Sequence, residues 1–195
     1  MSWISNPRRE FDSNNAYLIT CRANTNEECF WGNWIWKLKN LPKINLFLWK
    51  CFHNSIPVKI ILAHRGIQLS PACDICNDQL ETISHVLREC IAAQEIWAES
   101  NWLDDMHHTF GLEVMEWIKS NSCCTMLAKG KSYPWAHFFL FGICYLWLQR
   151  NKRMFQSPQT YMNLCKTMES QVYEYWYCVR DMQIPGLILL LLLVG

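Results

Sequence analysis

The stretch Cys73-Asp-Ile-Cys76-Asn-Asp-Gln-Leu-Glu-Thr-Ile-Ser-His85-Val-Leu-Arg-Glu-Cys90 is the densest run of metal-ligand residue types in the chain. Its spacing is C-x2-C-x8-H-x4-C. A Cys3His set satisfies the tetrahedral preference of Zn²⁺ and leaves no open position, which is typical of a structural site. Four ligands in one short window are more specific than a lone Cys-x-x-Cys, so chance clustering is the weaker interpretation. The sequence predicts one structural Zn²⁺ held by Cys73, Cys76, His85 and Cys90.

The backbone around these ligands is constrained by their spacing. Residues 82–89 have helical periodicity, but five residues separate His85 from Cys90, which is about 140° around an ideal α-helix. An unbroken helix therefore cannot present both residues to one metal. We expect the helix to end or tighten just before Cys90 and a new helix to start at Ile91.

Composition indicates a globular intracellular protein. The chain has 195 residues, is 51% hydrophobic and holds eleven tryptophans, enough for a substantial core in one domain or one and a half. Its net charge of +1 gives no global signature of polyanion binding. The N-terminus lacks the apolar core of a signal peptide, so its eleven cysteines are expected to be reduced thiols in the nucleus or cytoplasm, not in a secreted protein.

Apolar periodicity predicts an all-α fold: a small helical domain built around the Cys3His zinc loop and followed by C-terminal helices. The helix over 42–54, with Pro42 in its first turn, is expected to be the centre of the domain and buried on most sides. The aromatic run 30–36 is interpreted as core rather than as a ligand-stacking surface. Other helices are expected over 15–19, 57–65 (stopped by Gly66), 91–102, 113–119, 135–155 and about 160–179.

Charges are segregated along the chain. Residues 31–72 carry six Lys or Arg and no acid, whereas residues 73–105 carry eight acids and one base. Basic residues interleaved with aromatics can form a nucleic-acid surface, but the basic helices can equally pack against the acidic metal loop. The candidate nucleic-acid-binding residues are Lys37, Lys39, Lys43, Lys50, Arg65, Arg150, Lys152 and Arg153.

A set of motifs in a fixed order carries a family resemblance. They are Trp34-Ile-Trp-Lys-Leu, Leu41-Pro-Lys-Ile-Asn-Leu-Phe-Leu-Trp-Lys, His53-Asn-Ser-Ile-Pro, Arg65-Gly-Ile, Cys73-x2-Cys76, Glu81-Thr82, His85, Cys90 and Trp97. Over roughly residues 10–105 the chain closely resembles the zinc-binding domain of plant non-LTR retrotransposon reverse transcriptases. The later Trp147-Leu-Gln-Arg-Asn-Lys-Arg-Met-Phe resembles a helix that often follows that domain.

The resemblance implies four segments. Residues 1–29 are a polar segment, the remnant of an upstream linker; residues 30–105 are the zinc-binding domain; residues 106–183 are a C-terminal helical region; and residues 184–195 are an aliphatic tail. In the family this domain lies between a polymerase and a ribonuclease H. The chain has neither a Tyr-x-Asp-Asp motif nor the carboxylate set of a ribonuclease H, so we expect an excised fragment that is not an enzyme.

The expected function is a zinc-stabilised nucleic-acid-binding module. A protein-interaction scaffold and a non-functional retroelement remnant are the alternatives. The expected partners are RNA or DNA and other reverse transcriptase domains. A membrane is not expected, because the ten residues after Pro185 reach only about 15 Å as a helix, against a hydrocarbon core of about 30 Å.

Overall fold

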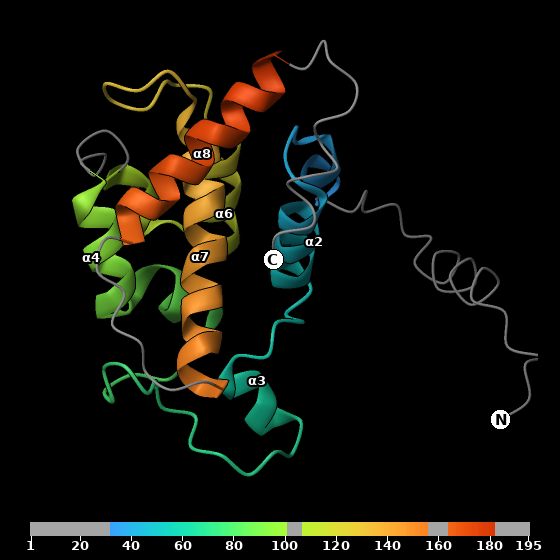
Figure 1. Cartoon of the computed structure of the whole chain (residues 1–195). Helices are drawn as coiled ribbons and strands as arrows, with labels where there is room; N and C mark the ends of the chain where they lie inside the picture. Colours follow the sequence, from blue (N-terminus) through green and yellow to red (C-terminus); the bar gives the residue numbers. More distant parts are fainter. Residues whose placement is uncertain (1–31, 101–106, 156–163, 182–195) are drawn as a thin grey trace, which may run out of the picture. The chain divides into compact units, whose positions relative to one another are not determined.

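The computed structural model describes residues 32–100, 107–155 and 164–181, and the regular elements in these ranges are helices joined by loops. The elements are η1 (Asn33–Lys37), α2 (Pro42–Phe52), α3 (Lys59–His64), η2 (His85–Glu89), α4 (Ile91–Glu99), η3 (His107–Gly111), α6 (Val114–Ser122), α7 (Trp135–Phe155) and α8 (Leu164–Asp181) (Figure 1). Extended pairing within these ranges amounts to two isolated bridges, Ala72 with Leu80 and Leu127 with Pro134. The all-α prediction is confirmed.

Two compact units divide the chain after Lys37. The first contains η1 alone among the named elements, and there Ile35 is buried whereas Trp36 is 54% exposed. The expectation that the aromatic run 30–36 is core is therefore wrong for Trp36, while Phe30 and Trp31 lie outside the described residues. The remaining elements belong to the second unit, so the predicted zinc-binding and C-terminal helical segments share one compact body.

Helix α7 occupies the middle of the second unit and packs against α2, η2, α6 and α8 (Figure 1). Its sequence is almost wholly apolar from Trp135 to Leu146, which explains why it is buried on several sides. The predicted central role of the 42–54 helix is therefore wrong. Helix α2 buries one face only, and its Leu46 is 46% exposed, because α7 covers a single side of it.

An aromatic cluster joins α4, α6 and α7. The Trp97 ring lies 5.5 Å from that of Phe139 and 6.0 Å from that of Trp117, centroid to centroid. Gly142 on α7 permits this approach, because a Cβ atom there would lie 2.8 Å from Cη2 of Trp97. Trp97 also donates from Nε1 to the Leu87 carbonyl oxygen at 3.0 Å, which ties the cluster to η2.

The ends of the helices follow local chemistry. Pro42 stands at the first turn of α2, Gly66 after α3 has φ +83°, and the Glu113 side chain accepts from Met115 N–H at the start of α6. The expectations for residues 15–19 and 184–195 lie outside the described ranges. Within those ranges no helix combines the length and the apolar character needed to cross a membrane.

Candidate metal centre

The loop that carries the first two cysteines is a tight, hydrogen-bonded turn. Cys73 N–H donates to the Gln79 carbonyl oxygen at 2.9 Å, and Asn77 N–H donates to the Cys73 carbonyl oxygen at 2.9 Å. Asn77 has φ +55°, a left-handed conformation that asparagine tolerates better than most residues. The chain therefore reverses directly after Cys76 and brings both sulfurs to one side.

The side chains of the four predicted ligands converge in the structure. Their ligand atoms all lie within 4.8 Å of one another, with Cys73 Sγ 3.8 Å from Cys90 Sγ and Cys76 Sγ 3.5 Å from His85 Nε2. Zn–S bonds of about 2.3 Å and Zn–N bonds of about 2.0–2.1 Å make tetrahedron edges of about 3.8 and 3.6 Å, respectively. The Cys73–Cys90 and Cys76–His85 distances match these edges, so the four side chains form a Cys3His group suited to a metal ion.

A π-helical turn brings the last two ligands together. Cys90 N–H donates to the His85 carbonyl oxygen at 2.8 Å, closing a wide turn over five residues. The helical segment ends at Glu89, just before Cys90 as predicted, but its last turn widens instead of tightening, and this widening returns Cys90 to the side of His85. Cys90 then adopts an extended conformation, with ψ 141°, and α4 starts at Ile91 as expected.

Hydrogen bonds orient the imidazole for coordination through Nε2. With the proton on Nδ1, that group donates to Gln79 Oε1 at 3.0 Å and leaves the Nε2 lone pair directed toward Cys76. The His85 backbone N–H donates to Thr82 Oγ1 at 3.0 Å. Burial lowers the pKa of His85, which keeps the ring neutral at pH 7 as metal binding requires.

The thiols differ in acidity. Backbone hydrogen bonds from Asp78, and then Gln79, lower the pKa of Cys76 and so favour its thiolate. Burial raises the pKa of Cys90 to about 12, so this thiol keeps its proton at neutral pH without a cation beside it. A metal ion bound here therefore displaces protons from the sulfurs.

A buried set of polar contacts, the brace, connects the metal loop, by which we mean residues 73–90, to α7 and α3. The Glu81 carboxylate accepts from Arg150 Nε at 3.1 Å, from Arg150 Nη2, and from the Lys59 backbone N–H at 2.9 Å. Both charged side chains are almost fully buried, Glu81 at 2% and Arg150 at 4% exposed. Lys59 Nζ donates to the Ala72 carbonyl oxygen at 2.8 Å and pairs with Asp74. Helices α3 and α7 thus hold the loop that carries Cys73.

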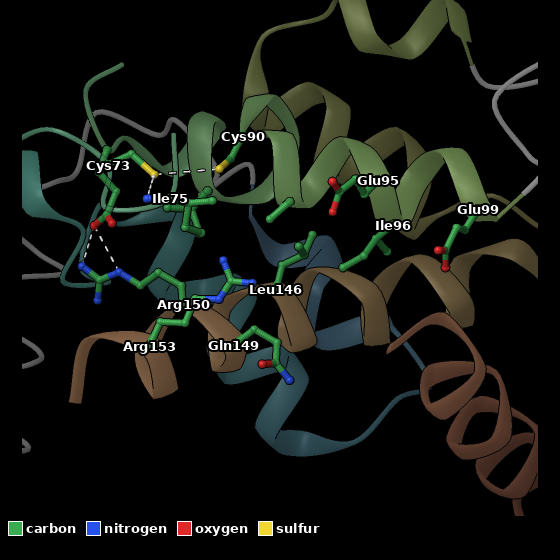
Figure 2. Close-up of a pocket in the computed structure, with 13 residues that line it drawn as sticks. Cys73, Ile75, Cys90, Glu95, Ile96, Glu99, Leu146, Gln149, Arg150 and Arg153 are labelled. Carbon is green, nitrogen blue, oxygen red and sulfur yellow. Dashed lines mark hydrogen bonds and ion pairs between the residues drawn. The ribbon is translucent and has the colours of Figure 1, made fainter. Parts of the chain in front are cut away.

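A small cavity of about 140 Å³ lies between the metal loop, α4 and α7. Figure 2 shows Cys73 and Cys90 at one end, Glu95 and Glu99 along α4, and Arg150 reaching back from α7. Carboxylates from α4 form part of its wall, and Arg150 is paired with Glu81. The cavity separates the ligand cluster from the charged face of α4.

The predicted basic residues divide into two groups. Arg150 is buried in the brace, and its guanidinium also covers the Trp147 ring, with Cζ 5.0 Å from the ring centroid. The remaining seven predicted residues are exposed: Lys37, Lys39, Lys43, Lys50, Arg65, Lys152 and Arg153. Pairing with the acidic metal loop therefore accounts for Arg150 and Lys59, whereas the seven other side chains reach solvent.

Sequence reasoning missed the residues that support the ligands. Gln79 lies in a loop with no periodicity, so no spacing rule singles it out as the partner of His85. Glu81 and Arg150 are 69 positions apart, and each is quoted in a family motif, but nothing in the sequence pairs them. The presence of Glu81 and Arg150 in family motifs was the signal that could have identified them as important residues.

Comparisons with known proteins agree with the ligand spacing. Residues 11–97 match the family model described as zinc-binding in reverse transcriptase. The chain is 25% identical over 161 residues to an Arabidopsis thaliana protein named "putative ribonuclease H protein". That match covers 80% of this chain and 25% of the relative, so the chain spans about a quarter of that protein's length. No solved structure gives a significant match. The resemblance to a reverse transcriptase zinc-binding domain is confirmed.

Proposed function

We propose that this chain is a zinc-stabilised nucleic-acid-binding module derived from a non-LTR retrotransposon reverse transcriptase. The observation that carries the proposal is the Cys3His group, whose interatomic distances fit a zinc tetrahedron inside a segment that matches a zinc-binding family. Three thiols and an imidazole fill all four positions of such a site. The metal then organises the fold and has no vacancy for water or substrate, which favours a binding role over a catalytic one.

The nucleic-acid part of the proposal rests on the exposed cations. Six of them lie in the second unit, although the chain as a whole has a net charge of only +1. A local basic surface is sufficient for phosphate binding, because each neutralised phosphate releases condensed counterions. Exposed lysines and arginines on a neutral protein therefore support a localised, salt-sensitive contact.

A gel-shift titration with single-stranded RNA over a salt series tests the proposal. Phosphate-driven binding should weaken linearly in log K against log salt, with a slope of about −0.7 for each phosphate contacted. A slope near zero, or no binding at low salt, would exclude a nucleic-acid role and favour the protein-interaction scaffold. Elemental analysis of the same preparation should give one equivalent of zinc per chain.

A further inference from the structure

A second hollow lies on the opposite side of α7 from the metal loop, between α2, α7 and α8. It has a volume of about 530 Å³, within the range of about 300–1,000 Å³ that ligand pockets span. Ile44 and Phe141 are buried and form its floor, while Phe47, Tyr145 and Trp147 are half-buried along its walls. We refer to this hollow as the α2–α7 groove.

Two aromatic rings face each other along this groove. The Phe47 and Trp147 ring centroids lie 6.3 Å apart, and the ring planes are 29° from parallel. Arg150 holds the indole in place, with Cζ 5.0 Å from the ring centroid, and is itself anchored by Glu81. Phe47 stacks against the indole and Arg150 lies over the same ring, so the outer face of Phe47 is the one that a further planar group can extend.

The groove carries positive charge at its edges. Lys43 and Lys152 line it and are exposed, and the described lining residues include no carboxylate. Lys50 follows Lys43 by seven positions, so the helical repeat places both on the face of α2 that carries Phe47. The cavity beside the metal loop differs, because Glu95 and Glu99 form part of its wall and would repel phosphate.

We propose that the α2–α7 groove binds single-stranded nucleic acid, with Phe47 stacking on a base, Trp147 backing the Phe47 ring, and Lys43 and Lys152 neutralising phosphates. The inference rests on the proposed function and assigns it a site. Aromatic platforms flanked by cations recognise single strands with little sequence preference, because every base has a stacking face. Paired bases in a duplex do not offer that face, so the groove discriminates against duplexes.

Fluorescence anisotropy with a labelled 12-nucleotide single strand, as RNA and as DNA, and with the matched duplex tests this assignment on the full chain. The double variant Lys43→Gln/Lys152→Gln should lower the log–log salt slope by about 1.4, since two phosphate contacts are lost. The matched control Lys129→Gln/Lys166→Gln removes the same charge at exposed positions outside the groove. It should leave the slope within error of the wild type.

The rings are tested separately from the charges. Phe47→Leu should weaken single-strand binding by about 5- to 150-fold, the equivalent of one lost stacking contact, while Phe47→Tyr keeps a ring and most of the affinity. Trp147→Leu removes the ring that backs Phe47 and should cause a smaller loss of single-strand affinity. Neither substitution should change duplex affinity. Unchanged zinc content and circular dichroism establish that each variant is folded.

The outcomes separate this inference from the function on which it rests. Salt-dependent binding by the wild type, with groove variants indistinguishable from the Lys129/Lys166 control, overturns the groove and leaves the proposed function standing. An absence of binding by the wild type overturns both. Equal losses for single strands and duplexes overturn the stacking role and reduce the groove to a phosphate contact.

Discussion

Glu81 and Arg150 meet in the interior, 69 positions apart, and form a buried ion pair between the metal loop and α7. Removing one partner of such a pair leaves an uncompensated buried charge, which typically costs about 3–5 kcal/mol. Arg150→Met should therefore lower the free energy of unfolding by that amount in urea titrations of the zinc-loaded protein. Arg153→Met, one turn away on an exposed position, is the control and should change stability by less than about 0.5 kcal/mol.

The double variant Glu81→Gln/Arg150→Met provides a further check on the same pair. Because it removes both charges, it should recover part of the loss seen for Arg150→Met alone. Additive losses would mean that the two residues are not energetically coupled.

Zinc stoichiometry should depend on each cysteine of the ligand group. Cys76→Ala removes one of four donors, so elemental analysis should show far less than one equivalent of zinc and circular dichroism a loosened fold. Cys123→Ala is the matched control, because Cys123 is exposed and lies outside the ligand group. Full zinc content in the Cys76 variant contradicts the assignment.

The π-helical turn predicts an unusual sensitivity to length. Inserting one alanine after Glu89 lengthens the wide turn to six residues, which places Cys90 about 240° around an ordinary α-helix from His85 and so on a different face. Zinc content should fall as it does for a ligand substitution. Glu89→Ala should retain zinc, because the Glu89 side chain pairs with Arg88 on the half-exposed surface. Normal zinc content after the insertion would show that the five-residue turn is not needed.

The substitution Gly142→Ala should destabilise the fold. A Cβ atom there lies 2.8 Å from Cη2 of Trp97, whose ring is backed by other aromatic rings and cannot retreat freely. Overpacking costs about 1–3 kcal/mol, and the better helix propensity of alanine offsets about 1 kcal/mol. We expect a net loss near 1 kcal/mol in thermal unfolding. Gly111→Ala, where nothing lies within 4 Å of the new Cβ, should be neutral.

The two faces of α2 should differ in their tolerance of truncation. Leu48 is fully buried, so Leu48→Ala should cost about 2–5 kcal/mol. Phe47 is half-buried in the α2–α7 groove, so Phe47→Ala should cost nearer 1 kcal/mol. Chemical denaturation of both variants measures the contrast, and equal losses would mean that α2 is packed on both sides.

The sequence predicted that the four Cys and His side chains would cluster, but it did not predict the residues that surround them. Cysteines and a histidine at metal-ligand spacing seldom occur together unless they bind a metal, which is why Cys73, Cys76, His85 and Cys90 could be grouped without a structure. The choice of α2 as the central helix failed for a physical reason. Helical periodicity shows that a face is apolar but does not show how many neighbours cover it, and the continuous apolar run of α7 was the better indicator.

The pairing of distant polar groups could not be predicted in this way. Lysine and arginine are mostly exposed in proteins, so nothing in the sequence marked Lys59 and Arg150 as buried. The structure shows that Lys59 donates to the Ala72 carbonyl oxygen beside the metal loop and that Arg150 pairs with Glu81. The remaining candidate nucleic-acid residues stay a prediction, because their exposure is compatible with binding but does not test it.

The segment that matches the family is shorter than the segment that packs around Trp97. The family match ends at this residue, yet its ring packs against Trp117, Trp135 and Phe139, which all follow it in the chain. A piece cut after residue 105 strips the indole of these neighbours and exposes the face of η2 that packs on α7. Moving the metal loop into another protein would therefore require moving α6 and α7 with it, because they cover Trp97 and η2.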